Sequence, residues 1–191
     1  MKITKRSRHL VLFMAIGDGH IKNGCLHIRH SKEQKEYLEW KKKLLNKNGI
    51  TTTPIVEIDN EVYTFRTYSH EFIRLYYRIL YNKGKNISDI KILKKINPIG
   101  LAILYMDRGG LTFKKKNGRI TGCYLTINTY LSKENNQIII DYFRDEWNIN
   151  FNQIKSGKFY KLRCGTKETE KFIDIVKPYL VEVSCMKHKL K

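Results

Sequence analysis

The sequence contains an internal repeat, and this repeat restricts the fold more than any other feature. The apolar segment LVLFMAIGDGH (10–20) has a counterpart of the same form in GLAILYMDRGG (100–110). Each is followed by two short strands around a KNG turn (22–24 and 116–118) and then by a helix. A chain that repeats the same order of elements predicts two similar units rather than one irregular core.

The alternation of residue types predicts the secondary structure within each repeat. Apolar and polar residues alternate at 26–29 and at 125–128, as in strands with one buried face. Ser31 and Ser132 are suited to begin the helices that follow, because a serine side chain can cap a helix N-terminus. A second hairpin and a further helix close each half. The order helix-strand-strand-helix-strand-strand-helix therefore occurs twice.

These patterns predict an α+β protein of tandem αββαββα repeats. We place the first repeat at residues 1–80, a basic linker at 81–98 and the second repeat at 99–191. The linker is polar and contains Gly84 and Pro98, which interrupt regular structure. The total length of 191 residues is sufficient for one sizeable core or two small ones.

The charge of the chain indicates a polyanionic partner. Lysine and arginine number 37 against 18 acidic residues, which gives a formal net charge of +19. A folded protein with this much self-repulsion typically binds nucleic acid. A membrane surface fits less well, because the basic residues are spread over predicted strands and loops rather than along one helix face. A basic ribosome-associated protein would explain the charge but not the duplicated pattern.

The sequence also indicates where the protein acts. No apolar run reaches the roughly 18 residues needed to span a bilayer, and the basic N-terminal residues lack a signal-peptide cleavage site. The four cysteines have no CxxC spacing, as expected for reduced thiols. We expect an intracellular protein located with the DNA, in a bacterial or phage cytoplasm or in an organelle matrix.

The two segments that end in GDG and MDRGG, set in duplicated repeats, resemble the LAGLIDADG homing endonucleases of the single-chain, intron-encoded kind. The segment LAILYMDRG (101–109) is similar to the family's LAIWYMDDG, and CMKHKL (185–190) resembles its terminal MKYKL. The resemblance covers residues 10–190. It implies two motif helices packed side by side at the repeat interface on a pseudo-twofold axis. It also implies two antiparallel, saddle-shaped sheets that lie along the DNA major groove.

The ends of the two motif helices carry the predicted chemistry. A carboxylate in the last turn of a helix faces the negative end of the helix dipole, so Asp18 calls for a local cation. By position, Asp18 matches the essential acid of the family, which implies Mg²⁺ (or Mn²⁺) as cofactor. The corresponding residue in the second motif is Arg108, and Asp107 precedes it. We therefore predict Asp18 and Asp107 as metal ligands.

The place of Arg108 leaves two alternatives open. One residue is about 100° of rotation on a helix, so Asp107 cannot simply take over the ligand geometry of the missing acid. Local unwinding near Gly109 and Gly110 would let Asp107 turn inward and give a functioning, asymmetric site. Otherwise Arg108 removes a metal ligand, or contacts a backbone phosphate directly in place of the metal.

The resemblance assigns further residues around the metal. By position, Arg29 and His30 match the polar pair that ends the family's second strand, and Asn128 and Thr129 match it in the second half. Lys187 matches the lysine of the C-terminal motif, and Lys83 or Lys85 takes that part after the first repeat. The predicted catalytic set comprises Asp18, Asp107, Arg108, Lys187, Arg29 and His30.

The polar faces of the hairpins are predicted to contact DNA, because a two-stranded ribbon fits the major groove, where arginine and lysine read guanine and asparagine reads adenine. Other contacts are to phosphates, which position the protein without specifying sequence. The predicted contact residues are Lys22, His27, Arg29 and Arg66 in the first repeat, and Lys114, Lys116, Arg119, Thr126, Asn128, Lys161 and Arg163 in the second. The aromatic residues Tyr63, Phe65, Tyr76, Tyr77 and Tyr160 are expected in the core rather than as stacking platforms.

These features predict a monomeric, metal-dependent, site-specific endonuclease, a phosphodiester hydrolase of homing type that cuts a long double-stranded DNA target. The alternative is a cleavage-deficient family member that acts on intron RNA as a splicing maturase or binds DNA without cutting. Arg108 favours the alternative, whereas Asp18 and the basic strands are compatible with both.

Overall fold

The computed structural model describes residues 3–81 and 85–190, which form two compact units. The first unit comprises the chain up to Lys85 together with residues 181–187, and the second comprises residues 86–180 with the last few residues of the chain. No helix among the described residues has the length and apolar character needed to cross a membrane.

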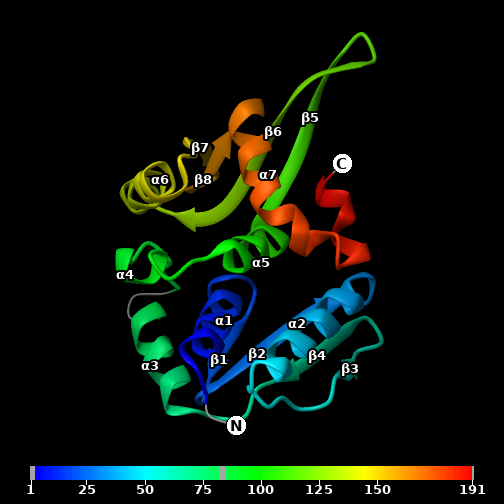
Figure 1. Ribbon diagram of the computed structural model, residues 1–191, viewed down its shortest axis with the longest axis vertical. Coiled ribbons are helices and arrows are strands. Elements are labelled where there is room, and N and C mark those ends of the chain that lie inside the picture. The colour runs from blue at the N-terminus through cyan, green and yellow to red at the C-terminus, as the bar shows by residue number, and fades with distance from the viewer. Residues whose placement is uncertain (1–2, 82–84, 191) are drawn as a thin grey trace. The chain divides into compact units, whose positions relative to one another are not determined.

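The first unit contains a four-stranded antiparallel sheet in the order β1-β2-β4-β3 (Figure 1). Its elements in chain order are α1 (Lys5–Ile16), β1 (His20–Lys22), β2 (Cys25–Ser31), the short helix η1 (Lys32–Gln34), α2 (Lys35–Lys47), β3 (Val56–Ile58), β4 (Val62–Arg66) and α3 (Glu71–Leu80).

The second unit repeats this arrangement with a sheet in the order β5-β6-β8-β7. The β5–β6 hairpin is much longer than its counterpart and extends beyond the rest of its sheet (Figure 1). The elements are α4 (Ile90–Leu93), α5 (Pro98–Arg108), β5 (Gly109–Lys116), β6 (Arg119–Leu131), α6 (Lys133–Trp147), β7 (Asn152–Ser156), β8 (Phe159–Cys164) and α7 (Thr166–Leu180), and the chain ends in η2 (Ser184–Leu190). The predicted α+β fold with tandem repeats is confirmed.

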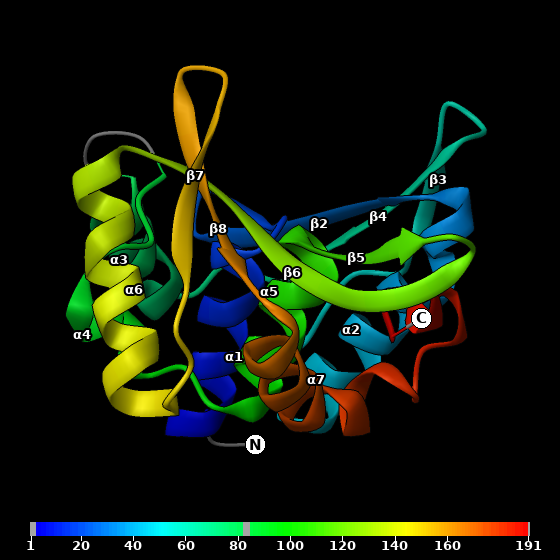
Figure 2. The same cartoon turned by 90° about the horizontal axis from the view of Figure 1, so that it is seen from above.

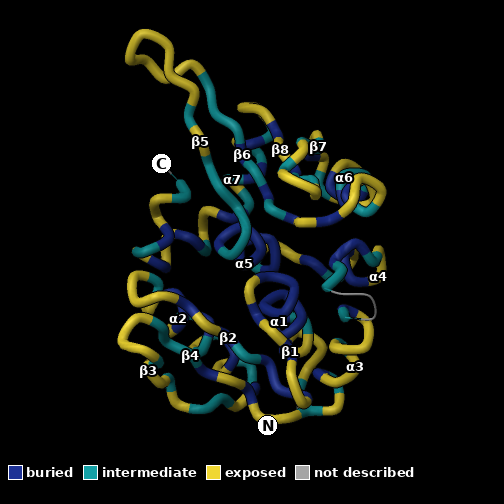
Figure 3. Tube along the Cα trace, turned by 180° about the vertical axis from the view of Figure 1, so that it is seen from behind, coloured by how far each residue is buried: buried dark blue, intermediate teal, exposed yellow. Residues whose placement is uncertain are grey.

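The two motif segments form helices that are buried on every side. In α1 the side chains from Leu10 to Ile16 are buried, and in α5 those from Gly100 to Met106 are buried (Figure 3). Thr4 caps α1 by accepting the Ser7 N–H, and Asn97 caps α5 in the same way. These segments are apolar on every face of the helix, so their sequences favour complete burial over packing on one side only.

Each sheet has one packed face and one exposed face. In the first unit α2 lies along one face of the sheet (Figure 2), where Leu26, Ile28 and Phe65 are buried. Leu125 and Leu162 occupy the same position in the second unit, against α6 and α7. Since successive strand residues point to opposite faces, the polar residues between them are directed to the other, exposed face.

The unit boundaries differ from the predicted domain boundaries in two places. Of the predicted linker 81–98, the part from residue 86 onward belongs to the second unit, where Ile92 and Leu93 of α4 are buried and α4 packs on α6. The apolar residues within the basic stretch explain why it folds; Lys83 and its neighbours at 82–84 lie outside the described residues.

The second difference concerns residues 181–187, which the predicted boundaries place in the second repeat but which fold with the first unit. The Glu36 carboxylate on α2 accepts the backbone N–H groups of Ser184 and Cys185 at 2.7 and 2.9 Å. These hydrogen bonds, above all the one from Ser184, lower the pKa of Glu36. The contact depends on one carboxylate far away in sequence, which no local pattern reveals.

Candidate functional site

The end of α1 is widened so that Asp18 lies at its exposed tip. The Gly17 N–H closes a normal helical turn on the Phe13 carbonyl, but the Gly19 N–H reaches back to the Met14 carbonyl at 2.9 Å, one residue further than an α-helical bond. A Cβ at residue 19 would lie 2.5 Å from that Met14 oxygen, so only glycine permits the approach. The sequence GDG therefore presents one exposed carboxylate between two buried glycines.

The end of α5 has a different form. The helix stays regular through Arg108, and the Gly109 N–H closes an ordinary turn on the Tyr105 carbonyl before β5 begins directly. The local unwinding near Gly109 and Gly110 that would turn Asp107 inward is not present. Two contacts keep the end of α5 regular. One is the Gly109 hydrogen bond, and the other is the Tyr105 ring, which packs so closely on Gly109 that a Cβ at residue 109 would lie 1.9 Å from it.

The glycine contact carries a stability prediction. Gly109→Ala is expected to lower the free energy of unfolding of the chain by about 2 kcal/mol, because the added methyl group must displace the buried Tyr105 ring. Gly165→Ala is the matched control, since a Cβ at residue 165 meets nothing within 4 Å. Chemical denaturation of both variants measures the difference, and equal effects would contradict the packing argument.

The strand registers establish which residue of α5 corresponds to Asp18. His20 of β1 pairs with His27, which pairs with Arg66 of β4. In the second unit Gly110 of β5 pairs with Thr126, which pairs with Arg163 of β8.

His20 and Gly110 therefore occupy equivalent ladder positions, and the residues two places before them are Asp18 and Arg108. The structure thus assigns Arg108, and not Asp107, to the position of Asp18. The Arg108 side chain turns toward its own sheet, where Nη1 donates to the Asn128 carbonyl at 3.4 Å.

A lysine ammonium group lies at the carbonyl end of each motif helix. In the first unit Lys85 Nζ donates to the Gly17 carbonyl and, at 3.0 Å, to the Gly19 carbonyl. In the second unit Lys189 Nζ donates to the carbonyls of Met106 and Gly109, the latter at 2.9 Å. Both place a positive charge at the negative end of a helix dipole, which stabilises these ends.

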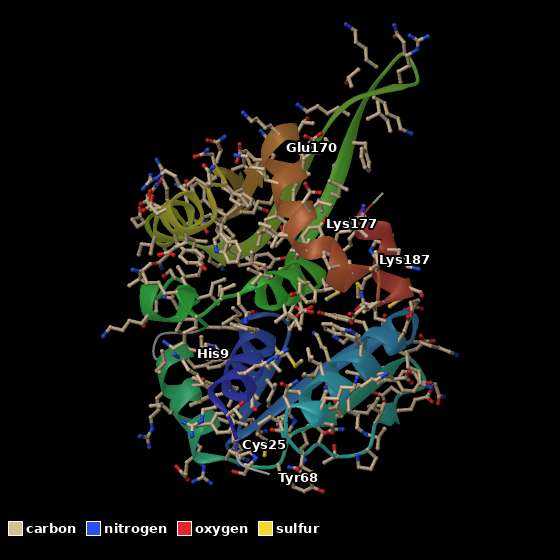
Figure 4. The ribbon with its side chains drawn as sticks, in the orientation of Figure 1. His9, Cys25, Tyr68, Glu170, Lys177 and Lys187 are labelled. Carbon is tan, nitrogen blue, oxygen red and sulfur yellow. The ribbon has the colours of Figure 1, made fainter. Side chains whose placement is uncertain are left out.

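These lysines were only partly anticipated from the sequence. Lys85 is one of the two residues predicted for the first repeat, whereas the residue predicted for the second is Lys187. Lys187 lies exposed on η2 (Figure 4), in the first unit, where its charge contributes to the lowered pKa of Glu36. The signal for Lys189 is helical period: in a 3₁₀ helix it shares a face with the buried Met186, three residues earlier.

A depression of about 430 Å³ surrounds Asp18. Its walls are His20, Lys22, His27 and Arg29 from β1 and β2. Burial and then the neighbouring Arg66 lower the pKa of His27, with smaller contributions from the other basic groups in the depression. The carboxylate therefore lies in a strongly positive pocket that suits a phosphate group.

His30 does not belong to this pocket, and its assignment to the catalytic set requires correction. The side chain is 6% exposed on the packed face of the sheet, where Nε2 lies 3.0 Å from Nζ of the buried Lys41. Arg29 and His30 are neighbours in one strand, so they cannot both face the pocket. Thr129 is buried in the same way and donates to Asn136 at 2.6 Å.

The residues predicted to contact DNA share one face within each unit. In the first unit His27 pairs with Arg66, and Lys22 and Arg29 have the same strand parity. In the second unit Thr126 pairs with Arg163 and Lys116 with Arg119. The remaining members, Lys114, Asn128 and Lys161, follow the same alternation.

A divalent cation fits the end of α1 but not the equivalent position of α5. Asp18 offers one exposed carboxylate, while the flanking Gly17 and Gly19 carbonyls accept from Lys85. Among the described residues no group of three histidine, cysteine or acidic side chains could hold a metal alone. Mg²⁺ is commonly held by one or two carboxylates together with phosphate oxygens and water, so this donor set suits an ion shared with a phosphate. The guanidinium of Arg108 offers no ligand atom.

Comparisons with known proteins show the family to which the chain belongs. A family model described as the LAGLIDADG DNA endonuclease family matches residues 11–172. The chain is 28% identical over 70% of its length to a probable intron-encoded DNA endonuclease 3 of Mycosarcoma maydis, of which it covers 97%. It is 27% identical over 99% of its length to a RecA protein of Mycolicibacterium flavescens, and it spans 47%, about half, of that relative.

Solved structures show the same fold. The homing endonuclease I-WcaI bound to its DNA recognition sequence superposes with a TM-score of 0.79 at 22% identity, over 100% of this chain and 88% of that one. The meganuclease I-SmaMI bound to uncleaveable DNA gives a TM-score of 0.57 at 10% identity, over 91% and 85%. With the repeat, the two glycine-ended helices and the match across most of the sequence, the chain belongs to the LAGLIDADG DNA endonuclease family.

Proposed function

We propose that this protein is a monomeric DNA endonuclease of homing type that nicks one strand of a long double-stranded target. The observation that carries the proposal is the register equivalence of Asp18 and Arg108, which leaves an acidic helix end in the first unit and a basic one in the second. An enzyme with one acidic helix end is expected to hydrolyse one strand and bind the other.

Binding is assigned to the exposed faces of the two sheets. Basic side chains lie along both, from Lys22 and Arg66 in the first unit to the long β5–β6 hairpin in the second. The net charge of +19 supports strong, salt-dependent attraction to DNA. A two-stranded β-ribbon fits the major groove, where its arginine and lysine side chains would reach the base edges.

Cleavage is assigned to the pocket at Asp18. Asp18 would hold a divalent cation, which when bound would supply charge neutralisation and an activated water molecule. Lys85 fixes the Gly17–Gly19 loop through its two carbonyl contacts and so holds the Asp18 carboxylate in place. Lys22 and Arg29 are positioned to bind the phosphate oxygens.

Arg108 is assigned a binding role on the other strand. Its guanidinium is positively charged and can bind a phosphate through two parallel hydrogen bonds. It can therefore neutralise phosphate charge, but it cannot hold a metal or activate water. The same residue favours the second candidate function, a family member that binds DNA or intron RNA without cutting it.

The test is a cleavage assay on supercoiled plasmids that carry a library of target sequences, with Mg²⁺ or Mn²⁺. Nicked circles are the expected product, and end-labelled duplexes of the selected target should show the cut on one strand only. Linear product as the first species would contradict the single-strand proposal. Tight duplex binding without any cut would support the second candidate instead.

A further inference from the structure

The first unit has a second depression, of about 800 Å³, between the β1 hairpin and α3. Its walls include His20 and Lys22 of β1, which also line the pocket at Asp18. The opposite wall consists of Arg74, Tyr77, Arg78 and Tyr81 from α3 and its C-terminal cap. We refer to this depression as the β1–α3 groove.

The spacing of the α3 residues shows that the groove wall is one continuous helix stripe. Residues 74, 77, 78 and 81 recur at helical intervals of three and four, which places them on one face. A stripe that faces a sheet edge is usually apolar, whereas this one alternates arginine and tyrosine. The prediction that Tyr77 belongs to the core is wrong, because its side chain is 47% exposed.

The aromatic rings in the groove form a stack with an accessible end. Tyr77 and Tyr81 are stacked with centroids 5.0 Å apart and planes 17° apart, and the His20 ring meets Tyr81 edge-on at 5.7 Å. Since Tyr77 is half exposed, a further planar ring can extend the stack on its side.

The charged side chains that line the groove are basic, and the turn after β1 lies close to one of them, Arg74. Gly24 lies at φ +74°, and a Cβ there would come within 2.9 Å of Arg74 Nε, so glycine lets the β1 turn approach the arginine. Arg74 pairs with Glu71 at 3.0 Å, but both side chains are more than half exposed, so this ion pair costs little to exchange for a phosphate. Arg78 and Lys22 add positive charge on either side.

We propose that the β1–α3 groove binds an unpaired nucleotide of a nucleic-acid strand. Its base would stack on Tyr77, and its phosphate would contact Arg74 and Arg78. Paired bases within a duplex have no free face to offer, so the site selects single-stranded nucleic acid. The recognised chemistry, a planar base with a phosphate, is common to DNA and RNA. The proposal does not depend on cleavage at Asp18, because the groove uses α3 residues that the cleavage pocket lacks.

The experiment measures the binding of the full chain to short labelled oligothymidylate and oligouridylate by fluorescence anisotropy, alongside a duplex of the same length. Tyr77→Ala is expected to weaken single-strand binding by about 10-fold, in line with the value of one base stack, and Tyr77→Phe to retain it. Arg78→Ala should also reduce the salt dependence, by about 0.7 in the log–log slope for one lost phosphate contact. Comparing the two oligonucleotides distinguishes DNA from RNA as the source of the nucleotide.

Leu75→Ala is the matched control, because Leu75 is 53% exposed on α3 but does not line the groove. It should bind all three probes as the unmodified chain does. Single-strand binding that is unchanged in Tyr77→Ala would overturn the proposal. So would an equal loss on the single strands and the duplex, since that result indicates a general change in the fold or in non-specific attraction.

Discussion

Asp18→Asn is expected to reduce strand cleavage by about 1,000-fold or more, equivalent to about 4 kcal/mol of transition-state stabilisation. Asparagine keeps the size of the side chain but removes the negative charge that would hold a divalent cation against the phosphate. The remaining side chains of the pocket are histidine, lysine and arginine, none of which carries a negative charge. The rate of appearance of nicked plasmid measures the effect.

The same substitution should leave folding and duplex binding intact. Asp18 lies at the negative end of the α1 dipole but among basic side chains, so the unfavourable dipole interaction and the attraction to these groups oppose each other, and removing the charge is expected to change the free energy of unfolding by less than about 1 kcal/mol. Duplex affinity in metal-free buffer should rise slightly, because one like charge no longer opposes the phosphates.

Asp174→Asn is the control for charge alone, since Asp174 is an exposed residue of α7. If it slowed cleavage as much as Asp18→Asn, or if Asp18→Asn cut at the normal rate, the Asp18 site would not be the place of reaction. A loss of activity accompanied by a much lower melting temperature would also contradict the argument, because the variant would then have lost its fold rather than one ligand.

Sequence periodicity predicted the parts of the fold that depend on local order. The alternation at 26–29 and 125–128 correctly indicates strands with one buried face, and the repeat indicates two sheets of equal topology. The same alternation also decides which side chains can line the Asp18 pocket, because it directs His30 to Lys41 on the opposite face of the sheet. A positional match to a family pattern takes no account of which face a side chain occupies.

Contacts between distant segments could not be predicted in this way. Lys85 and Lys189 reach the helix ends from outside the motifs, and Glu36 ties residues 184–185 to α2 across most of the chain. Lys85 and Glu36 are single charged groups that meet backbone atoms and leave no periodic trace in the sequence, whereas Lys189 shows only its spacing of three residues from the buried Met186. The widened turn at Gly19 could not be predicted either. The two motifs align residue by residue, yet the Gly19 N–H bonds five residues back and the Gly109 N–H bonds four residues back.

Restoring the acid in the second unit tests whether the absence of a ligand is what prevents a double-strand break. Asp107→Gly combined with Arg108→Asp rewrites MDRG as MGDG, which matches the IGDG sequence of α1. The double variant is needed because regular helix geometry extends through Arg108, whereas the glycine before Asp18 lies in the widened turn of α1. It is expected to convert nicked plasmid to linear product, with second-strand cleavage at least about 100-fold faster than in the unmodified chain.

Arg108→Ala separates the gain of a ligand from the loss of the guanidinium. It removes the proposed phosphate contact and the hydrogen bond to the Asn128 carbonyl without adding an acid, so it should bind the duplex more weakly and still only nick it. Linear product from Arg108→Ala would show that the arginine obstructs a site completed by Asp107. Nicking alone from the double variant, with duplex binding retained, would show that the helix-end equivalence derived from the strand registers does not extend to catalysis. Since Arg108→Ala keeps Asp107 and the acid-restoring variant does not, Asp107→Gly combined with Arg108→Ala completes the comparison. It differs from the acid-restoring variant only at residue 108, so nicking alone from it would assign second-strand cleavage to the carboxylate at that position.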